Sequence, residues 1–468
     1  MIQIDLQPTF TLHDQLRTWS RTHEASWRAA CNEARERLHE AGIRFEGGRD
    51  LPLALTALLL RPEDEARLRV ATERLHQIIE RVLDLLLNSP ELLERHFPTH
   101  RRMFPYLRKT NGQTLWQGIS RYDATLDANG VVKFIELNTA CPAGFFNTDI
   151  FSEVTAQALQ HCAIPLDFKM DHHATIRADS FMDGLLEIER RSGRLPQVIG
   201  LLNDENKLKH ELDLMVSAFA ARGRQAVVAG AQELELRNGQ AFWQGHPLSL
   251  AYHKLRISTE HSPNHCWKPG FEDRYGAFLS ALNSGALPAM NNLAAMTVAE
   301  DKSLLAVMRH ADVQAVLPEE DREFLAENVL WTAILPQHDS GKGQAGDEAS
   351  EADLHDLHTH RERWVIKPAN EGRGFGVVVG KYATAAEWAQ SCLPRDDLPC
   401  IIQRYAEPAH LPVVLPTANG LQEQPMFLTL AFGLVLGRYQ GLMSRISAKP
   451  VTNVALHGTL QAAYCLTH

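Results

Sequence analysis

Residues 120–144, SRYDATLDANGVVKFIELNTACPAG, restrict the possible folds of this chain more than any other segment. Two strand-like runs flank residues 127–130, whose Asp, Asn and Gly favour a turn, so the segment predicts a β-hairpin. If the loop has an even number of residues centred between Ala128 and Asn129, Asp123 faces Phe134 and Arg121 faces Glu136. Because side chains alternate along a strand, polar groups of both strands then share one face.

The polar side chains that this register collects are Arg121, Asp123, Glu136 and Asn138. Carboxylate and amide oxygens around one point are typical of a Mg²⁺ site, in which water and substrate phosphates complete the ligand set. An odd loop would move Asp123 to the opposite face and remove this site. A surface hairpin with solvated charges is the alternative interpretation, although the neighbouring apolar residues favour a functional site because unpaired acids are costly to bury.

A lysine and a glycine-rich turn form a second candidate site in WVIKPANEGRGFGVVVG. Lys367 ends an apolar strand, and Gly372, Gly374 and Gly376 follow. Such a loop lets backbone N–H groups approach phosphate oxygens. The pattern is not a Walker A motif, and in protein kinases the lysine follows the glycines. Taken alone, a β-hairpin with a glycine turn explains these residues equally well.

Two further segments suit nucleotide binding. Lys302 lies just inside a helix start that Thr297 and Glu300 are predicted to cap, and helix N-termini favour anions. In IIQRYAEP, an apolar strand leads to Gln403 and Tyr405, where a strand-to-loop hinge can hold adenine. Taken separately, each segment has a simpler interpretation. Lys302 could be a solvated helix lysine, and IIQRYAEP could be an ordinary buried strand.

The remaining patterns indicate the organisation of the chain. Residues 1–110 are predicted to be helical, with a 3.6-residue apolar period over residues 63–87. PQVIGLLND, a helical run and QAVVAG predict a Rossmann-type βαβ unit, without the GxGxxG of a dinucleotide site. Residues 338–360 are polar and acidic, so we expect a mobile insertion.

Charge and composition exclude several classes of protein. A net charge of -10 argues against a nucleic-acid or anionic-membrane surface, because phosphate groups require clustered Lys and Arg. No apolar run is long enough to span a membrane, and the N-terminus lacks the features of a secretory signal. Seven cysteines without a CxxC pair indicate neither a zinc site nor a disulfide framework. We therefore expect a cytoplasmic protein with reduced thiols.

In this order, from about residue 115 to the C-terminus, the motifs resemble the circularly permuted branch of the ATP-grasp superfamily, which includes glutathionylspermidine synthetase. RYD…ELN is similar to the family's magnesium hairpin, and DKSLLAVM and VIKPANEGRGFG are similar to its two ATP-lysine segments. MSRIS resembles a terminal hairpin that carries an arginine, and PVTN follows it. The strand AYHKLRIST departs from the family, because Lys254 stands where an arginine is expected. The acidic insertion has no recognised counterpart.

The resemblance implies an α/β (α+β) fold, a circularly permuted ATP-grasp with an N-terminal helical region and a Rossmann-like βαβ subdomain. Five parts are expected along the chain. They are a helical region (1–110), a hairpin and helices with the metal ligands (111–195), the Rossmann-like subdomain (196–290), the ATP-binding subdomain with the insertion at 338–360 (291–424), and C-terminal strands that complete the core (425–468).

The implied function is an ATP- and magnesium-dependent carboxylate–amine ligase that forms an amide through an acyl-phosphate and releases ADP and phosphate. Its expected substrates are a small-molecule carboxylate and an amine. The implied ligands are Asp123, Glu136 and Asn138 for Mg²⁺, Lys302, Lys367, Gly372, Gly374, Gln403 and Tyr405 for ATP, Arg121 and Arg445 for the acyl-phosphate and oxyanion, and Lys254, Arg256 and Asn453 for substrate.

Other functions stay open at this point. An ATP-grasp protein that transfers phosphate without ligation, one that uses an amine on a larger partner, or an inactive nucleotide-binding module would carry many of the same residues. A metalloprotein built on His355, His358 and His360 is a further alternative, although HExxH is absent and histidines in an acidic loop are often solvated.

Overall fold

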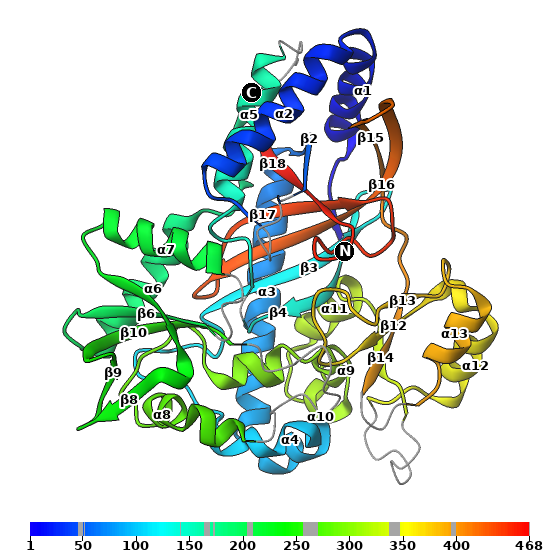
Figure 1. Cartoon of the computed structure of the whole chain (residues 1–468). Helices are drawn as coiled ribbons and strands as arrows, with labels where there is room; N and C mark the ends of the chain where they lie inside the picture. The colour runs from blue at the N-terminus through cyan, green and yellow to red at the C-terminus, as the bar shows by residue number, and fades with distance from the viewer. Residues whose placement is uncertain are drawn as a thin grey trace.

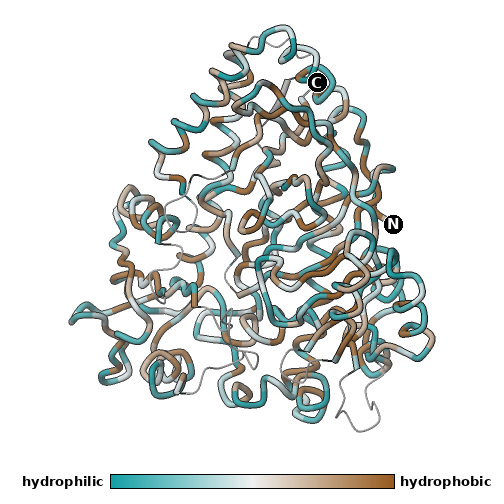
Figure 2. Tube along the Cα trace, turned by 45° about the vertical axis from the view of Figure 1, so that its right-hand side comes forward, coloured by the Kyte–Doolittle hydropathy of each residue, from teal (hydrophilic) through white to brown (hydrophobic). Residues whose placement is uncertain are grey.

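Three β-sheets organise the part of the chain that the computed structural model describes, residues 1–44, 50, 52–140, 142–162, 169–171, 174–203, 209–255, 270–336, 347–394 and 399–467. Within these residues the sheets have nine, five and four strands, and helices pack around them (Figure 1). Hydrophobic residues concentrate in the interior strands and hydrophilic residues in the outer helices and loops (Figure 2). None of the described helices is long and apolar enough to cross a membrane.

The nine-stranded sheet joins segments from both ends of the chain. Its path is β1-β4-β3-β16-β17-β18-β2, with β15 paired to β16 and β5 paired to β18. The pairs are antiparallel except for β2 and β18, which are parallel. The strands are β1 (Ile2–Gln3), β2 (Leu53–Leu60), β3 (Ile119–Leu126), β4 (Val131–Asn138), β5 (Lys169–Asp171), β15 (His410–Thr417), β16 (Gly420–Val435), β17 (Arg438–Ser447) and β18 (Thr459–Thr467).

Helices of the N-terminal region cover this sheet. They are α1 (Gln7–Thr22), α2 (Glu24–Glu40) and α3 (Pro62–Leu87). The next helix, α4 (Pro90–His96), packs on α3 and on the 3₁₀ helix that follows it (Pro98–Tyr106). The apolar period predicted for α3 is confirmed, because one face of the helix is buried against the sheet. Pro62 and three acidic residues begin α3, as suits the positive end of a helix dipole.

The prediction of helices alone over the first 110 residues is wrong for two segments. The two strands β1 and β2 belong to the large sheet. β2 is an almost wholly buried run of apolar residues, LALTALLL. Such a run shows no period, so the sequence does not distinguish a buried strand from a buried helix.

The five-stranded sheet contains the predicted βαβ unit. β6 (Val198–Asn203) is parallel to β7 (Ala226–Gly230), and α7 (Lys209–Ala221) connects them. β10 (His246–Lys254) lies parallel to β6 on its other side. The sheet also contains β8 (Leu234–Arg237) and β9 (Gln240–Trp243), and it is packed by α6 (Ala178–Ser192), α8 (Phe271–Asn283) and a 3₁₀ turn (Ala231–Glu233). The preceding helix α5 (Thr148–His161) packs instead on α2 and on β2 and β18 of the large sheet.

The four-stranded sheet is antiparallel, in the order β11-β14-β12-β13. Its strands include those predicted before and after the glycine-rich loop and in IIQRYAEP. The strands are β11 (Thr332–Ile334), β12 (Trp364–Pro368), β13 (Val378–Val379) and β14 (Cys400–Arg404). The helices nearby are a π-helical turn (Ala295–Ala299), α9 (Ser303–Val307), α10 (Ala311–Gln314), α11 (Glu319–Asn328), α12 (Glu351–Thr359), a 3₁₀ turn (Arg361–Arg363) and α13 (Ala385–Ser391).

Two local predictions differ from the structure in this region. Part of the insertion expected at 338–360 is α12, which begins with a capping box between Ser350 and Asp353. Residues 338–346 lie outside the described residues. The capping box expected between Thr297 and Glu300 is absent, because Thr297 lies inside the π-helical turn and donates to the Leu293 carbonyl, 2.7 Å away.

Candidate functional site

The hairpin β3–β4 reaches the predicted one-sided arrangement by a register that differs from the predicted one. Leu126 pairs with Val132, so the loop is odd and centred on Asn129. Farther from the loop, Ala124 pairs with Phe134, whereas Asp123 pairs with Glu136. The predicted pairs, Asp123 with Phe134 and Arg121 with Glu136, are therefore wrong.

Ile135 is the extra residue in β4, and the resulting β-bulge changes the side-chain alternation. An odd loop alone would put Asp123 and Glu136 on opposite faces. A bulge adds one residue to one strand and so reverses the alternation beyond it. Asp123 consequently lies opposite Glu136, and Arg121 lies opposite Asn138. Residues directly opposite one another share a face, so all four polar side chains gather on one side of the sheet.

Asp123 is held between two guanidinium groups. Arg121 Nε donates to its Oδ1 over 3.0 Å, and Arg445 Nη2 donates to its Oδ2 over 2.6 Å. The three side chains are almost fully buried. Burial opposes ionisation of Asp123, but Arg121 and Arg445 outweigh this effect and hold its pKa below the usual range. Both carboxylate oxygens are thus engaged by arginine in this structure.

Glu136 faces Lys302. The distance from Lys302 Nζ to Glu136 Oε1 is 3.1 Å, and the same ammonium group donates to the Glu371 carbonyl over 2.5 Å. Lys302 immediately precedes α9 and is buried. Burial disfavours its charge, yet Glu136 and Glu300 outweigh burial and raise the pKa of Lys302. Glu136 is the more accessible partner, with 23% of its side chain exposed.

Lys367 binds the bulge itself. Its Nζ donates to the Ile135 carbonyl over 3.2 Å and to Gln403 Oε1 over 2.8 Å. Gln403 Nε2 donates to Ile135 as well, over 3.3 Å, and to Thr332 Oγ1 over 2.9 Å. Burial lowers the pKa of Lys367 to about 8, with nearby Glu136 opposing that shift. Gln403 therefore ties β14 to β4 beside the two lysines, and its side chain is already hydrogen-bonded.

Glu300 and Asn291 fix the backbone that follows Asn138, and neither was expected to belong to the site. Glu300 Oε2 accepts the N–H groups of Thr139 and Ala140, the latter over 2.8 Å. Asn291 Oδ1 accepts the N–H groups of Gly118 and Ile119 over 2.9 and 2.8 Å, and its Nδ2 donates to the carbonyls of residues 119, 139 and 140. These two residues hold both ends of the hairpin in place. The sequence pointed to Glu300 only as the acid of a capping box, and it gave no indication for Asn291.

The glycine-rich loop after β12 packs against the loop after β17. Gly374 has φ +75°, and a Cβ there would lie 2.7 Å from Val451 and 3.4 Å from the Cβ of Asn453. Arg373 has φ 62°, an uncommon conformation for a residue other than glycine. Gly372, in contrast, has open space around it. The close approach between the two loops thus explains why a glycine stands at position 374, and it gives no such reason for Gly372.

The remaining predicted residues have various environments. Tyr405 N–H donates to the Arg363 carbonyl over 2.7 Å, so this backbone donor is already used. Asn453 Oδ1 accepts the Ala455 N–H over 2.9 Å, which makes Asn453 a turn residue. The Lys254 side chain is fully buried in an ion pair with Glu211. Arg256 lies outside the described residues.

The described part of the chain has no dense cluster of metal-binding side chains. No group of three or more His, Cys, Asp and Glu side chains there is arranged to hold a metal ion, and this includes the histidines of α12. Asn138 Nδ2 donates to the Arg121 carbonyl over 3.3 Å, and no described group donates to the Asn138 amide oxygen. Glu136 and Asn138 therefore offer one carboxylate and one amide oxygen on the same face. This pair suits Mg²⁺, which takes few protein ligands beside water and phosphate.

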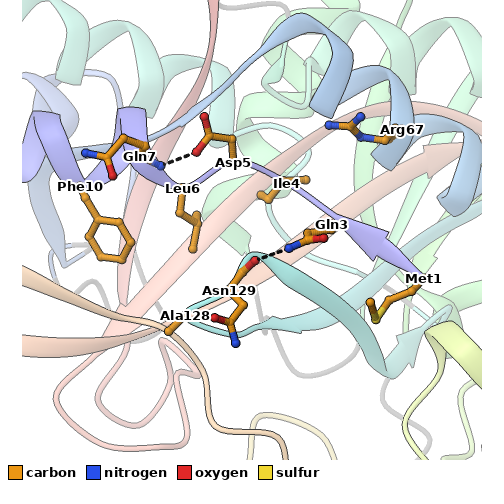
Figure 3. Close-up of a pocket in the computed structure, with 10 residues that line it drawn as sticks. All are labelled: Met1, Gln3, Ile4, Asp5, Leu6, Gln7, Phe10, Arg67, Ala128 and Asn129. Atoms are coloured by element: carbon orange, nitrogen blue, oxygen red, sulfur yellow. Dashed lines mark hydrogen bonds between the residues drawn. The ribbon is translucent and has the colours of Figure 1, made fainter.

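A groove of about 630 Å³ lies beside β1, away from these residues (Figure 3). It is lined by the N-terminal segment, by Arg67 of α3 and by the tip of the β3–β4 turn. None of the predicted site residues lines it. Of its two cations, Arg67 is paired with Asp64 and the N-terminal ammonium of Met1 is paired with Glu327. The groove is therefore a separate feature of the surface.

Comparison with known proteins agrees with this fold. No family model and no curated protein sequence matches the chain. Among solved structures, a glutathione synthetase-like effector from Globodera pallida, determined in its apo form, matches with a TM-score of 0.57 and 12% sequence identity. The match covers 93% of this chain and 96% of that chain. The chain has the fold of a glutathione synthetase-like protein.

The fold prediction is confirmed at this level, because the chain is a mixed α/β protein with an ATP-grasp-like α+β fold. At 12% identity, the comparison shows a likeness of fold alone. It does not support the narrower glutathionylspermidine synthetase-like branch.

Replacing Asp123 with Asn should destabilise the protein by about 3 kcal/mol at neutral pH, since two buried guanidinium groups lose their counter-charge. A carboxylate whose folded pKa is depressed contributes stability above its unfolded pKa and loses it as the pH falls through the folded value. The difference in the free energy of unfolding between wild type and Asp123→Asn should therefore become smaller below about pH 4. Urea unfolding at several pH values measures this.

Asp321→Asn is the matched control. Asp321 also pairs with two arginines, Arg74 and Arg81, but these are 37% and 51% exposed. Ion pairs with solvated partners contribute less, so the expected loss is about 1 kcal/mol or less. Equal losses in the two variants would contradict the role assigned to the buried clamp.

Proposed function

We propose that the protein is an ATP-dependent carboxylate–amine ligase that activates a small-molecule carboxylate as an acyl-phosphate and releases ADP and phosphate. The observation that carries the proposal is the convergence of Lys302 and Lys367 on Glu136 and the adjoining bulge carbonyl of Ile135. These groups come from three separate parts of the chain, the position just before α9, β12 and β4. A polyphosphate needs such a concentration of cations, and the chain as a whole is acidic.

Lys302 and Lys367 are assigned to the phosphate chain of ATP. Both ammonium groups are buried, where a charge interacts strongly and a phosphate oxygen would offset the cost of desolvation. In this structure Lys302 donates to the Glu371 carbonyl and Lys367 donates to the Ile135 carbonyl. An ATP phosphate would compete with these carbonyls for the two ammonium groups. The lowered pKa of Lys367 agrees with a cation that lacks a full counter-charge.

Mg²⁺ is assigned to Glu136 and Asn138, with water and phosphate oxygens as its other ligands. When bound, Mg²⁺ would neutralise part of the charge of the phosphate chain. Asp123 was expected to join this ligand set. We assign it instead to holding Arg121 and Arg445, because its two oxygens accept from both guanidinium groups.

Arg121 and Arg445 are assigned to the substrate carboxylate and its acyl-phosphate. Asp123 orients both guanidinium groups, and Arg445 Nε–H has no partner among the described residues. A buried donor without a partner is costly, so this N–H favours an anionic group beside it. The anion that forms during amine attack would be stabilised by the same donors.

The glycine-rich loop and the loop after β17 are assigned to the exclusion of water. An acyl-phosphate hydrolyses unless the site is closed, and the contact between Gly374 and Val451 lets the two loops close together. Circular permutation agrees with the order along the chain, in which the metal-ligand hairpin precedes both lysines. ATP, Mg²⁺, a small carboxylate and a small amine are the partners in this proposal.

Formation of ADP and of a condensed product from pairs of amino acids and small amines tests the proposal. Glu136→Gln should lower the rate about a hundredfold or more, since it removes the site's accessible carboxylate. Glu235→Gln is the control, because Glu235 is exposed and pairs only with Arg237 among the described residues. Full activity of Glu136→Gln would overturn the metal assignment. ATP binding without ADP formation across the panel would favour a nucleotide-binding module, and a phosphorylated, uncondensed product would favour phosphoryl transfer.

Lys367 should make nucleotide binding dependent on pH. Its pKa of about 8 in the free protein rises when phosphate binds, so affinity for ADP should fall as pH rises through this value. Between about pH 7 and about pH 9 we expect roughly a tenfold loss of affinity by isothermal titration calorimetry. In Lys367→Arg the side chain stays protonated, and the loss should disappear. The same pH dependence in Lys367→Arg would exclude Lys367 as its origin.

A further inference from the structure

A second cavity has a volume of about 160 Å³. It is formed by the segment from α9 to β11, and neither Lys302 nor Lys367 lines it. Leu305, Met308, Leu325 and Val329 contribute buried apolar side chains. Drug-sized ligands require about 300 Å³ or more, so a cavity of this size suits one small ring or a short aliphatic chain.

Two arginines lie at the rim of this cavity. Arg309 is exposed and lies over the ring of Trp331, with 5.0 Å from its Cζ to the ring centroid. Arg322 donates to the Gln314 carbonyl over 3.3 Å. Neither arginine forms an ion pair with a carboxylate in the described part of the chain.

Other arginines on the same side of the molecule are paired. Arg74 and Arg81 bind Asp321, and Arg95 binds Asp312. Arg309 and Arg322 thus provide positive charge next to an apolar floor, and the charge of Asp353, which is not ion-paired with Arg309, only partly offsets it. This combination is complementary to a small anion with an apolar body, because the carboxylate can reach the guanidinium groups while the body fills the cavity.

The cavity shares two structural elements with the proposed ATP site. Leu305 belongs to α9, and its N–H donates to the Lys302 carbonyl over 3.1 Å. Val329 forms a parallel bridge with Phe134 of β4, and the Leu330 N–H donates to the Phe134 carbonyl over 3.0 Å. An occupant would therefore contact the helix that Lys302 precedes and the segment paired with β4 just before Glu136.

We propose that this cavity binds a small monocarboxylate with an apolar body and that its occupancy weakens nucleotide binding. The occupant would hold α9 and β4 in the described arrangement, in which Lys302 is paired with Glu136 rather than with phosphate. A ligand shifts an equilibrium only by binding one arrangement better than the other, and a filled cavity provides that difference. The effect on nucleotide rests on the proposed function, whereas the binding site itself does not.

Benzoate is the probe, with benzamide as its neutral isostere. Benzoate should bind the full chain with one site and a dissociation constant of about 1 mM, as expected for a ligand of its size, and benzamide should bind about tenfold more weakly. The double variant Arg309→Gln, Arg322→Gln should lose about tenfold in benzoate affinity. Arg108→Gln should bind like wild type, because Arg108 is exposed, does not line the cavity and donates to the Pro105 carbonyl. Ala326→Phe, an exposed position at the rim, should block binding without disturbing the core.

Isothermal titration with benzoate and then with ADP separates the two parts of the proposal. Saturating benzoate should weaken ADP binding about fivefold in wild type and leave it unchanged in the double variant. No saturable benzoate binding, or equal binding by benzamide or by the double variant, overturns the site. Benzoate binding with unchanged ADP affinity overturns the coupling. Absence of ADP binding removes the coupling together with the proposed function, and the benzoate titration then decides the site alone.

Discussion

The site depends on one extra residue in β4. The bulge at Ile135 places Glu136 and Asn138 on the same face as Asp123, and it turns the Ile135 carbonyl toward Lys367 and Gln403. An uninterrupted ladder with the same loop would send these groups to opposite faces of the sheet. A regular hairpin with this loop could therefore not present these side chains on one face. Bulges are common next to active sites because they re-aim side chains, with a local bend of the strand.

The charged groups around the bulge are paired across long stretches of sequence. Asp123 binds Arg445 from the C-terminal hairpin, and Glu136 binds Lys302, which immediately precedes α9. Breaking a buried ion pair by removing one partner leaves an uncompensated charge, so these contacts hold the large sheet and the segment around Lys302 in a fixed relation. Under the proposed function, the same residues serve both stability and substrate binding. The charges that would bind substrates also join distant parts of the chain.

Local patterns in the sequence were sufficient to predict most elements near the site. The β3–β4 hairpin, the βαβ unit and the strands around Lys367 are marked by turn residues and apolar runs, which act over a few neighbours. The register of the hairpin was not predictable in this way, because Lys367 and Gln403, more than 200 residues away, bind the bulge carbonyl. Glu300 shows the same limit. Its spacing from Thr297 suits a helix cap. In the structure its carboxylate instead accepts hydrogen bonds from the N–H groups of residues 139 and 140. The partners of Asp123 were likewise hidden, since Arg445 lies in another strand.

The structure of the protein with Mg²⁺ and a non-hydrolysable ATP analogue tests the central claim most directly. The account predicts that phosphate oxygens contact Lys302 and Lys367 and that the metal ion contacts Glu136 and Asn138, with Asp123 still bound to its two arginines. A nucleotide bound at the five-stranded sheet instead, or a metal ion distant from Glu136, would contradict it.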